Sequence, residues 1–194
     1  QAPVDVAAPV EAPQQPVIEK PVVEAAQVIH VDSTADIVSG FDAHAEGIDD
    51  EIREIFLEEF TEEFGNLPEL LQQWREEPEN IELVRPIRRV FHTLKGSGRL
   101  VGAKDLSDFS WKIESLLNRV LDESRAPTPT VMEMVQTAIQ VLPSFHRALL
   151  GETVTLDMQG LAIAAERLAE GEEVYYAQAP ATAHLSAGQE AVVA

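Results

Sequence analysis

The sequence predicts an all-α protein: an antiparallel four-helix bundle with one extra C-terminal helix and disordered flanks. Apolar residues recur every three or four positions through the middle of the chain, no stretch keeps a two-residue alternation, and proline gathers near the start. The expected divisions are a Pro/Ala-rich disordered linker over 1–47, the bundle over 48–151, a weak C-terminal helix over 152–171 and a second disordered linker over 172–194.

The first helical segment has Asp49 or Asp50 available as its N-cap residue, and acidic residues fill its first turn, where the helix dipole favours negative charge. Pro68 removes one backbone hydrogen bond, so a kink or a break is expected there. The residues expected to point inward are Ile52, Ile55, Phe56, Phe60, Leu67, Leu70, Leu71 and Trp74.

The second segment begins near Asn80 or Pro86 and ends at Leu100, and Asp105 is a plausible cap for the third. Their inward residues are Ile87, Val90, Phe91 and Leu94 in the second and Leu106, Phe109, Ile113, Leu116, Leu117, Val120 and Leu121 in the third. A fourth segment runs from about Pro129, with a bend expected at Pro143, to a stop at Gly151, and a weaker fifth segment, with Met158, Leu161, Ala165 and Leu168 inward, ends at Gly171.

The composition narrows the classes of function. A formal net charge of −20 argues against a nucleic-acid partner, which requires a basic footprint. Without cysteine, neither disulfides nor thiolate metal sites hold the fold. No apolar run approaches the ~18 residues of a membrane span, so no membrane insertion is expected. The start at Gln1, without an initiator Met or a signal pattern, favours a piece of a longer, soluble protein.

One run, from Phe91 to Leu100, is chemically informative. Each helical residue turns by about 100°, so His92 lies about 200° from Val90 and from Leu94 and points to solvent at the border of the buried stripe. Gly96 leaves no side chain one turn beyond the imidazole, so a partner can approach a ring nitrogen closely.

Positive charge surrounds this histidine. Arg88, Lys95 and Arg99 share its helix face, and the last two place charge where a phosphoryl group on His92 would sit. Residues 85–104 hold six of the fourteen Lys and Arg side chains, whereas all 34 acidic residues lie elsewhere. Such a strip on so acidic a chain is a candidate docking surface for an acidic partner or an anionic group.

An exposed imidazole of near-neutral pKa can attack phosphorus, provided that its reactive nitrogen is unprotonated. A carboxylate that accepts from the other N–H would fix the tautomer and stabilise the developing positive charge. Glu114 is the candidate, because it flanks the core position Ile113 and can lie near the seam between the second and third helices. A surface histidine without function and a Gly-Ser-Gly helix end are the structural alternatives.

The run from His92 to Gly98 resembles the signature of histidine phosphotransfer (HPt) domains in chemotaxis-type hybrid histidine kinases. The continuation over 99–103, 111–114 and 117–120 is similar to HPt modules of the chemosensory systems that control type IV pili and twitching motility. The resemblance covers about residues 50–150.

The resemblance implies specific roles: His92 is phosphorylated, Lys95 is its basic neighbour, Gly96 opens access, and Glu114 holds the imidazole. The proposed binding residues are Arg88, Gly96, Ser97, Gly98 and Arg99. Trp111, beside that glutamate, is a position where members of the family vary.

The resemblance further implies a cytoplasmic phosphorelay. A kinase ATP-binding domain would phosphorylate His92, and the aspartate of a response-regulator receiver domain would exchange the phosphoryl group with it. No cofactor is expected in this fragment, because ATP would bind to the kinase domain and Mg²⁺ to the receiver. The fragment would be a phosphocarrier and not an autonomous kinase, although the parent chain would be a histidine kinase.

Two other functions compete with this one. The first is a degenerate bundle of the same fold that acts only as a scaffold or dimerisation module. The second is a helical metal-binding or hydrolytic protein, which the scattered histidines disfavour: His30, His44, His146 and His184 show no ligand spacing.

Overall fold

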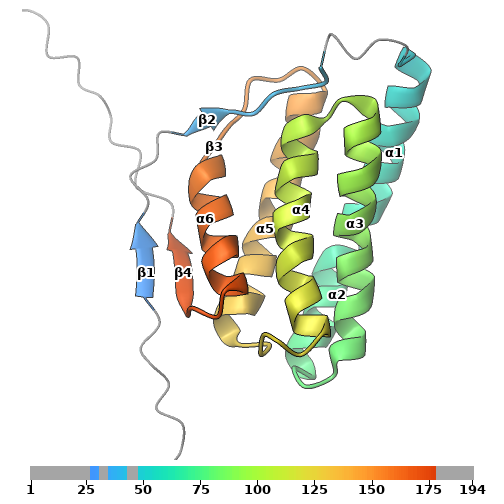
Figure 1. Cartoon of the computed structure of the whole chain (residues 1–194). Helices are drawn as coiled ribbons and strands as arrows, with labels where there is room; N and C mark the ends of the chain where they lie inside the picture. The colour runs from blue at the N-terminus through green and yellow to red at the C-terminus, as the bar shows by residue number, and fades with distance from the viewer. Residues whose placement is uncertain (1–26, 31–34, 43–47, 178–194) are drawn as a thin grey trace, which may run out of the picture.

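The structure of the protein, a computed structural model, describes residues 27–30, 35–42 and 48–177 (Figure 1). Helices supply most of its hydrophobic core, which confirms the predicted all-α class. The elements are β1 (Gln27–His30), β2 (Asp36–Ile37), α1 (Asp50–Gly65), α2 (Leu67–Glu76), the 3-10 turn η1 (Ile81–Leu83), α3 (Val84–Val101), α4 (Lys104–Leu121), α5 (Pro129–Leu149), β3 (Thr155–Leu156), α6 (Met158–Ala169) and β4 (Val174–Ala177).

The helices form a bundle in which α1 and α2 share one position, and α3, α4 and α5 fill the other three (Figure 1). Helices α3 and α4 lie side by side, and α6 packs on α4 as an additional helix. Within the described part of the chain, no helix is both long and apolar enough to cross a membrane.

The expected break at Pro68 is present. Helix α1 ends at Gly65, and α2 begins at Leu67 with Pro68 in its first turn, where a missing N–H leaves no helical bond unmade. Ile52 and Ile55 were expected to face inward but are about half exposed. Each four-residue step rotates by about 40°, so a face centred on Phe60 leaves Ile52 about 80° away.

The turn between α3 and α4 depends on Gly102. This residue has φ +82°, a left-handed conformation that favours glycine, and its N–H donates to the Arg99 carbonyl. Asp105 was expected to cap the next helix, but that helix has begun by Lys104, and the Asp105 carboxylate instead accepts from the Ser39 backbone N–H at 2.8 Å.

The described parts of the two expected linkers differ from the expectation of disorder. Residues 35–42 run along the bundle: β2 pairs with β3, and Val38 is buried. After α6, β4 pairs in parallel with β1. Residues 1–26, 31–34, 43–47 and 178–194 lie outside the described residues.

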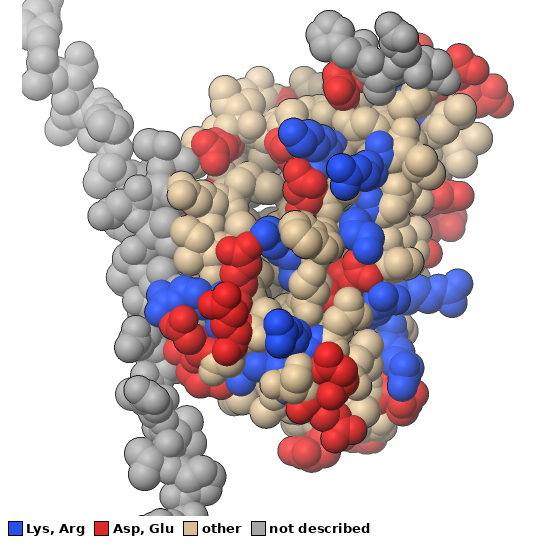
Figure 2. Space-filling model, in the orientation of Figure 1, with Lys and Arg blue, Asp and Glu red and all other residues tan. Residues whose placement is uncertain are grey.

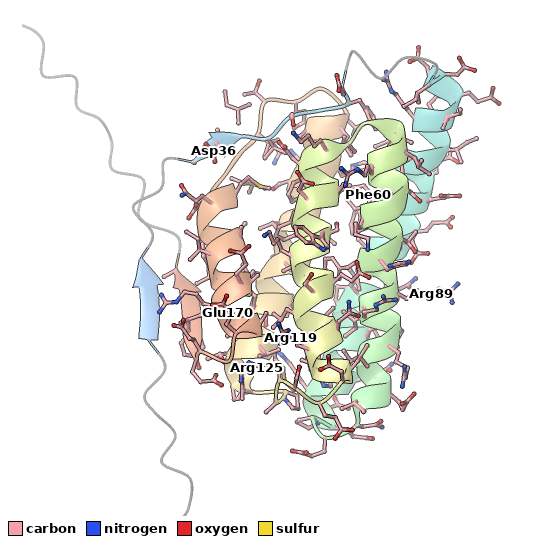
Figure 3. The ribbon with its side chains drawn as sticks, viewed as in Figure 1. Asp36, Phe60, Arg89, Arg119, Arg125 and Glu170 are labelled. Atoms are coloured by element: carbon pink, nitrogen blue, oxygen red, sulfur yellow. The ribbon has the colours of Figure 1, made fainter. Side chains whose placement is uncertain are left out.

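A buried arginine joins the C-terminal extension to the bundle. Arg125, 7% exposed, donates from Nε to the Leu168 carbonyl at 2.7 Å and from Nη2 to the Glu172 carbonyl at 3.1 Å, and it pairs with Glu173 at 2.7 Å (Figure 3). Glu173 also accepts from Thr128. The loop after α4 is thereby fixed to the end of α6 and the start of β4.

Candidate functional site

Helices α3 and α4 bring His92 and Glu114 together across their seam. The Nδ1 atom of His92 lies 2.7 Å from Oε1 of Glu114. The Glu114 side chain is 3% exposed, whereas the His92 side chain is 52% exposed. Because an ionised carboxylate can only accept, Nδ1 carries the hydrogen, and Nε2 on the other side of the ring is the nitrogen with the free electron pair.

Glu114 also binds two cationic side chains from α3. Lys95 Nζ lies 2.6 Å from Oε2, and an Arg88 guanidinium nitrogen lies 2.8 Å from Oε1. Burial raises the pKa of the Glu114 carboxyl, but the hydrogen bonds from Lys95 and His92 and the charges of Lys95 and Arg88 outweigh burial and hold its pKa below the ordinary value. Glu114 is therefore ionised at neutral pH.

Two contacts that the sequence analysis missed complete the seam. Arg88 Nε donates to Asn118 Oδ1 at 2.9 Å, and Ser107 Oγ donates to the Lys95 carbonyl at 2.7 Å. Asn118 could have been found, because it lies four residues after Glu114 and therefore on the same face of α4. The Ser107 contact has no comparable signal in the sequence.

The two glycines near His92 differ in their surroundings. A Cβ atom added to Gly96 would meet nothing within 4 Å, so the approach to the imidazole is open there. Gly98 is buried, and a Cβ on it would meet the Ala103 carbonyl oxygen at 3.5 Å and Ser107 at 3.8 Å. Gly98 was expected to bind a partner; instead it lets α3 approach α4 closely.

The other predicted binding residues do not all lie on the same face of α3. Ser97 lies about 140° from His92 around the helix axis, so it does not share the face of the imidazole. Arg99 is exposed and lines a hollow together with Lys95, Ser107, Asp108 and Trp111. Arg89, which belongs to the same basic strip, points away from the bundle (Figure 3).

Figure 2 shows blue Lys and Arg side chains spread over α3 and α4 on the viewed face.

Among the described residues, no cluster of three or more His, Asp or Glu side chains could hold a metal ion. His146 contacts the rings of Phe60 and Phe64 and lies 3.2 Å from the Thr61 hydroxyl, so it belongs to the border of the core. His44 and His184 lie outside the described residues.

Residues 51–145 match the family model described as "Hpt domain". This segment is therefore an Hpt domain, that is, a histidine phosphotransfer module.

The relatives include a sensor histidine kinase and a chemotaxis protein. Over 92 residues the chain is 33% identical to the sensor histidine kinase CheAY of Helicobacter pylori. The matched region is 47% of this chain and 12% of that protein. Over 106 residues it is 28% identical to the chemotaxis protein CheA of Listeria monocytogenes. That matched region is 55% of this chain and 16% of the Listeria protein. The chain thus spans less than a fifth of these relatives. No solved structure matches it significantly.

Proposed function

We propose that His92 accepts a phosphoryl group on Nε2 and exchanges it with the aspartate of a response-regulator receiver domain. The observation that supports this most directly is the contact between His92 Nδ1 and the buried Glu114 carboxylate, because it leaves Nε2 with its electron pair on the exposed side of the ring.

In the first step, the Nε2 electron pair attacks the γ-phosphorus of ATP held by a kinase domain. An N–P bond forms, the bond to the β-phosphate oxygen breaks, and ADP leaves. The ring keeps its Nδ1 hydrogen and becomes positively charged, and the Glu114 carboxylate at 2.7 Å stabilises that charge. Lys95, paired with Glu114 at 2.6 Å one turn along α3, adds positive charge close to the imidazole.

In the second step, a receiver carboxylate oxygen attacks the same phosphorus in line, the N–P bond breaks, and Nε2 recovers its electron pair. ATP on the kinase domain and Mg²⁺ on the receiver domain are proposed to belong to the partners. This fragment supplies the nucleophile, its orientation and the surrounding charge. The same in-line attack in the opposite direction would return the phosphoryl group from the receiver aspartate to Nε2.

The test compares wild type, His92→Gln and His146→Gln as substrates of a radiolabelled kinase domain or a phosphorylated receiver. Wild type and His146→Gln are expected to take up acid-labile, base-stable label, and His92→Gln none. Equal labelling of His92→Gln, or no labelling of a folded wild type by donors known to be active, contradicts the proposal. The second outcome favours the scaffold function.

We further propose that the parent protein is a cytoplasmic kinase of a chemosensory system that controls type IV pili and twitching. The support is the resemblance of the runs 99–103 and 111–114 to modules of such kinases. A chromosomal His92→Gln substitution should abolish or strongly alter surface twitching while swimming stays normal; unchanged twitching with altered swimming would contradict it.

A further inference from the structure

Trp111 is an exposed aromatic side chain next to the site. Among the described Phe, Tyr and Trp side chains it is the most exposed, at 52%, while the other tryptophan, Trp74, is fully buried. It lines a hollow with Lys95, Arg99, Ser107 and Asp108. What distinguishes Trp111 from other exposed apolar side chains, such as Leu100, is its place in this hollow.

The hollow lies on the same seam as His92. Lys95 is three residues beyond His92 on α3 and Arg99 seven, which at 1.5 Å per residue places them about 4.5 and 10.5 Å further along the helix axis. A partner that docks on His92 with a contact area of about 800 Å² extends well beyond the imidazole and can reach this hollow. On the other side of His92 a second hollow is lined by Arg85, Arg88, Asn118, Leu121 and Asp122, without an aromatic side chain.

Lys112, the next residue on α4, contacts the Trp111 ring and is itself held by α6. The Lys112 ammonium lies 4.7 Å from the centroid of the Trp111 ring, a cation–π distance, and Lys112 is itself paired with Glu166 of α6. An aromatic side chain that is ordered before binding loses little conformational entropy on binding, which is typical of residues that dominate protein interfaces.

We propose, on the basis of the phosphotransfer function above, that Trp111 is the residue by which the module selects its receiver domain. The hollow would receive an apolar receiver side chain next to a carboxylate. Arg99 and Lys95 outnumber the single acid that lines the hollow, Asp108. Lys95 is paired with the buried Glu114, so the exposed Arg99 is the cation that a partner carboxylate would meet. A receiver that binds Mg²⁺ and offers an aspartate nucleophile presents several carboxylates at its contact face, which is complementary in charge.

The experiment first phosphorylates His92 with phosphoramidate, a small donor that needs no docking surface. Transfer to a panel of receiver domains is then measured, and the fastest acceptor is titrated against wild type, Trp111→Ala, Trp111→Phe and the control Leu100→Ala. Leu100 is 78% exposed on α3 but is absent from the hollow. Circular dichroism confirms that each variant is folded.

Trp111→Ala is expected to raise the half-saturating receiver concentration at least tenfold and to leave the transfer rate at saturation within twofold of wild type. Trp111→Phe should restore most of the affinity, and Leu100→Ala should match wild type. Glu166→Gln, which releases Lys112, should give an intermediate rise of two- to fivefold. On receiver binding, tryptophan emission should shift to the blue in wild type, with no such shift in Trp111→Phe.

An unchanged half-saturating concentration in Trp111→Ala overturns the inference while the phosphotransfer function stands. The inference is also overturned if Trp111→Ala weakens phosphorylation by a kinase domain as much as it weakens transfer to the receiver. In that case the hollow would bind the kinase domain as well. If phosphorylated wild type transfers to no receiver, the proposed function itself fails, and that result is seen before any variant is compared.

Discussion

Glu114 is a buried carboxylate that contacts His92, Lys95 and Arg88 at once. Its position decides the chemistry of the imidazole, since Nδ1 is bound and Nε2 is left for reaction. It also places the positive charges of Lys95 and Arg88 beside the half-exposed His92. All three side chains stay within contact of the negative charge of Glu114.

The depressed pKa of Glu114 predicts a dependence of stability on pH. A carboxyl whose folded pKa lies below its ordinary value of 4.5 stabilises the fold above pH 4.5, and the contribution is lost as the pH falls through the lowered pKa. Glu114→Gln should therefore reduce the free energy of unfolding by about 2 kcal/mol at pH 7, and the difference from wild type should shrink below pH 4.5.

Urea unfolding of both proteins at pH 7 and at pH 3 measures this difference. Glu59→Gln, at an exposed position of α1, serves as the control and should change little at either pH. A difference between wild type and Glu114→Gln that stays constant from pH 7 to pH 3 would contradict the assignment.

The contact between His92 and Glu114 could be predicted from the sequence because both residues lie on strongly periodic helices. His92 and Glu114 are 22 residues apart, but helical periodicity places each at the edge of its own buried stripe, so their meeting follows once the two helices pair. Periodicity does not reveal how far around α3 a binding surface extends. Ser97 and Gly98 were therefore assigned to it, although one lies on another face and the other is buried.

One glycine within α3 and one at its C-terminal cap have surroundings that predict opposite effects of alanine. Gly96 is helical and open to solvent, whereas Gly102 ends the helix with φ +82°. Gly96→Ala should stabilise the fold by about 0.5–1 kcal/mol through helix propensity. Gly102→Ala should destabilise it by about 1–2 kcal/mol, because an L residue is strained in the left-handed region.

Thermal unfolding followed by circular dichroism compares the two variants directly. The same Gly96→Ala protein should accept phosphoryl groups from phosphoramidate normally but transfer them to a receiver more slowly, since the added methyl group lies one turn from the imidazole. Equal transfer rates for wild type and Gly96→Ala would show that access does not depend on this position.

The whole molecule includes segments that the sequence assigned to linkers. Alanine, valine and proline are the commonest residues before residue 48. The few packed residues there, such as Val38 and Phe41, have no periodicity that would distinguish them from a linker. Arg125 has no sequence signal at all, because its partners include two backbone carbonyls 43 and 47 residues away.

Arg125→Ala should destabilise the fold by about 3 kcal/mol, since it removes the cationic partner of the Glu173 carboxylate and the side-chain donor to the Leu168 and Glu172 carbonyls. Arg147→Ala removes an ion pair to Glu152 in which both side chains are about half exposed, and it should cost less than about 1 kcal/mol. Chemical denaturation of the two variants gives the comparison; equal losses would refute a structural role of Arg125.

The pairing of β1 with β4 has a mechanical consequence. The two strands are parallel, with Gln27 opposite Val174 and His30 opposite Ala177. The chain therefore enters the pair at one end and leaves it at the other, so tension applied through the two flanks would slide the strands along each other. Such a load is shared by all the hydrogen bonds of the pair at once, whereas in a hairpin pulled from its open end the bonds break one after another.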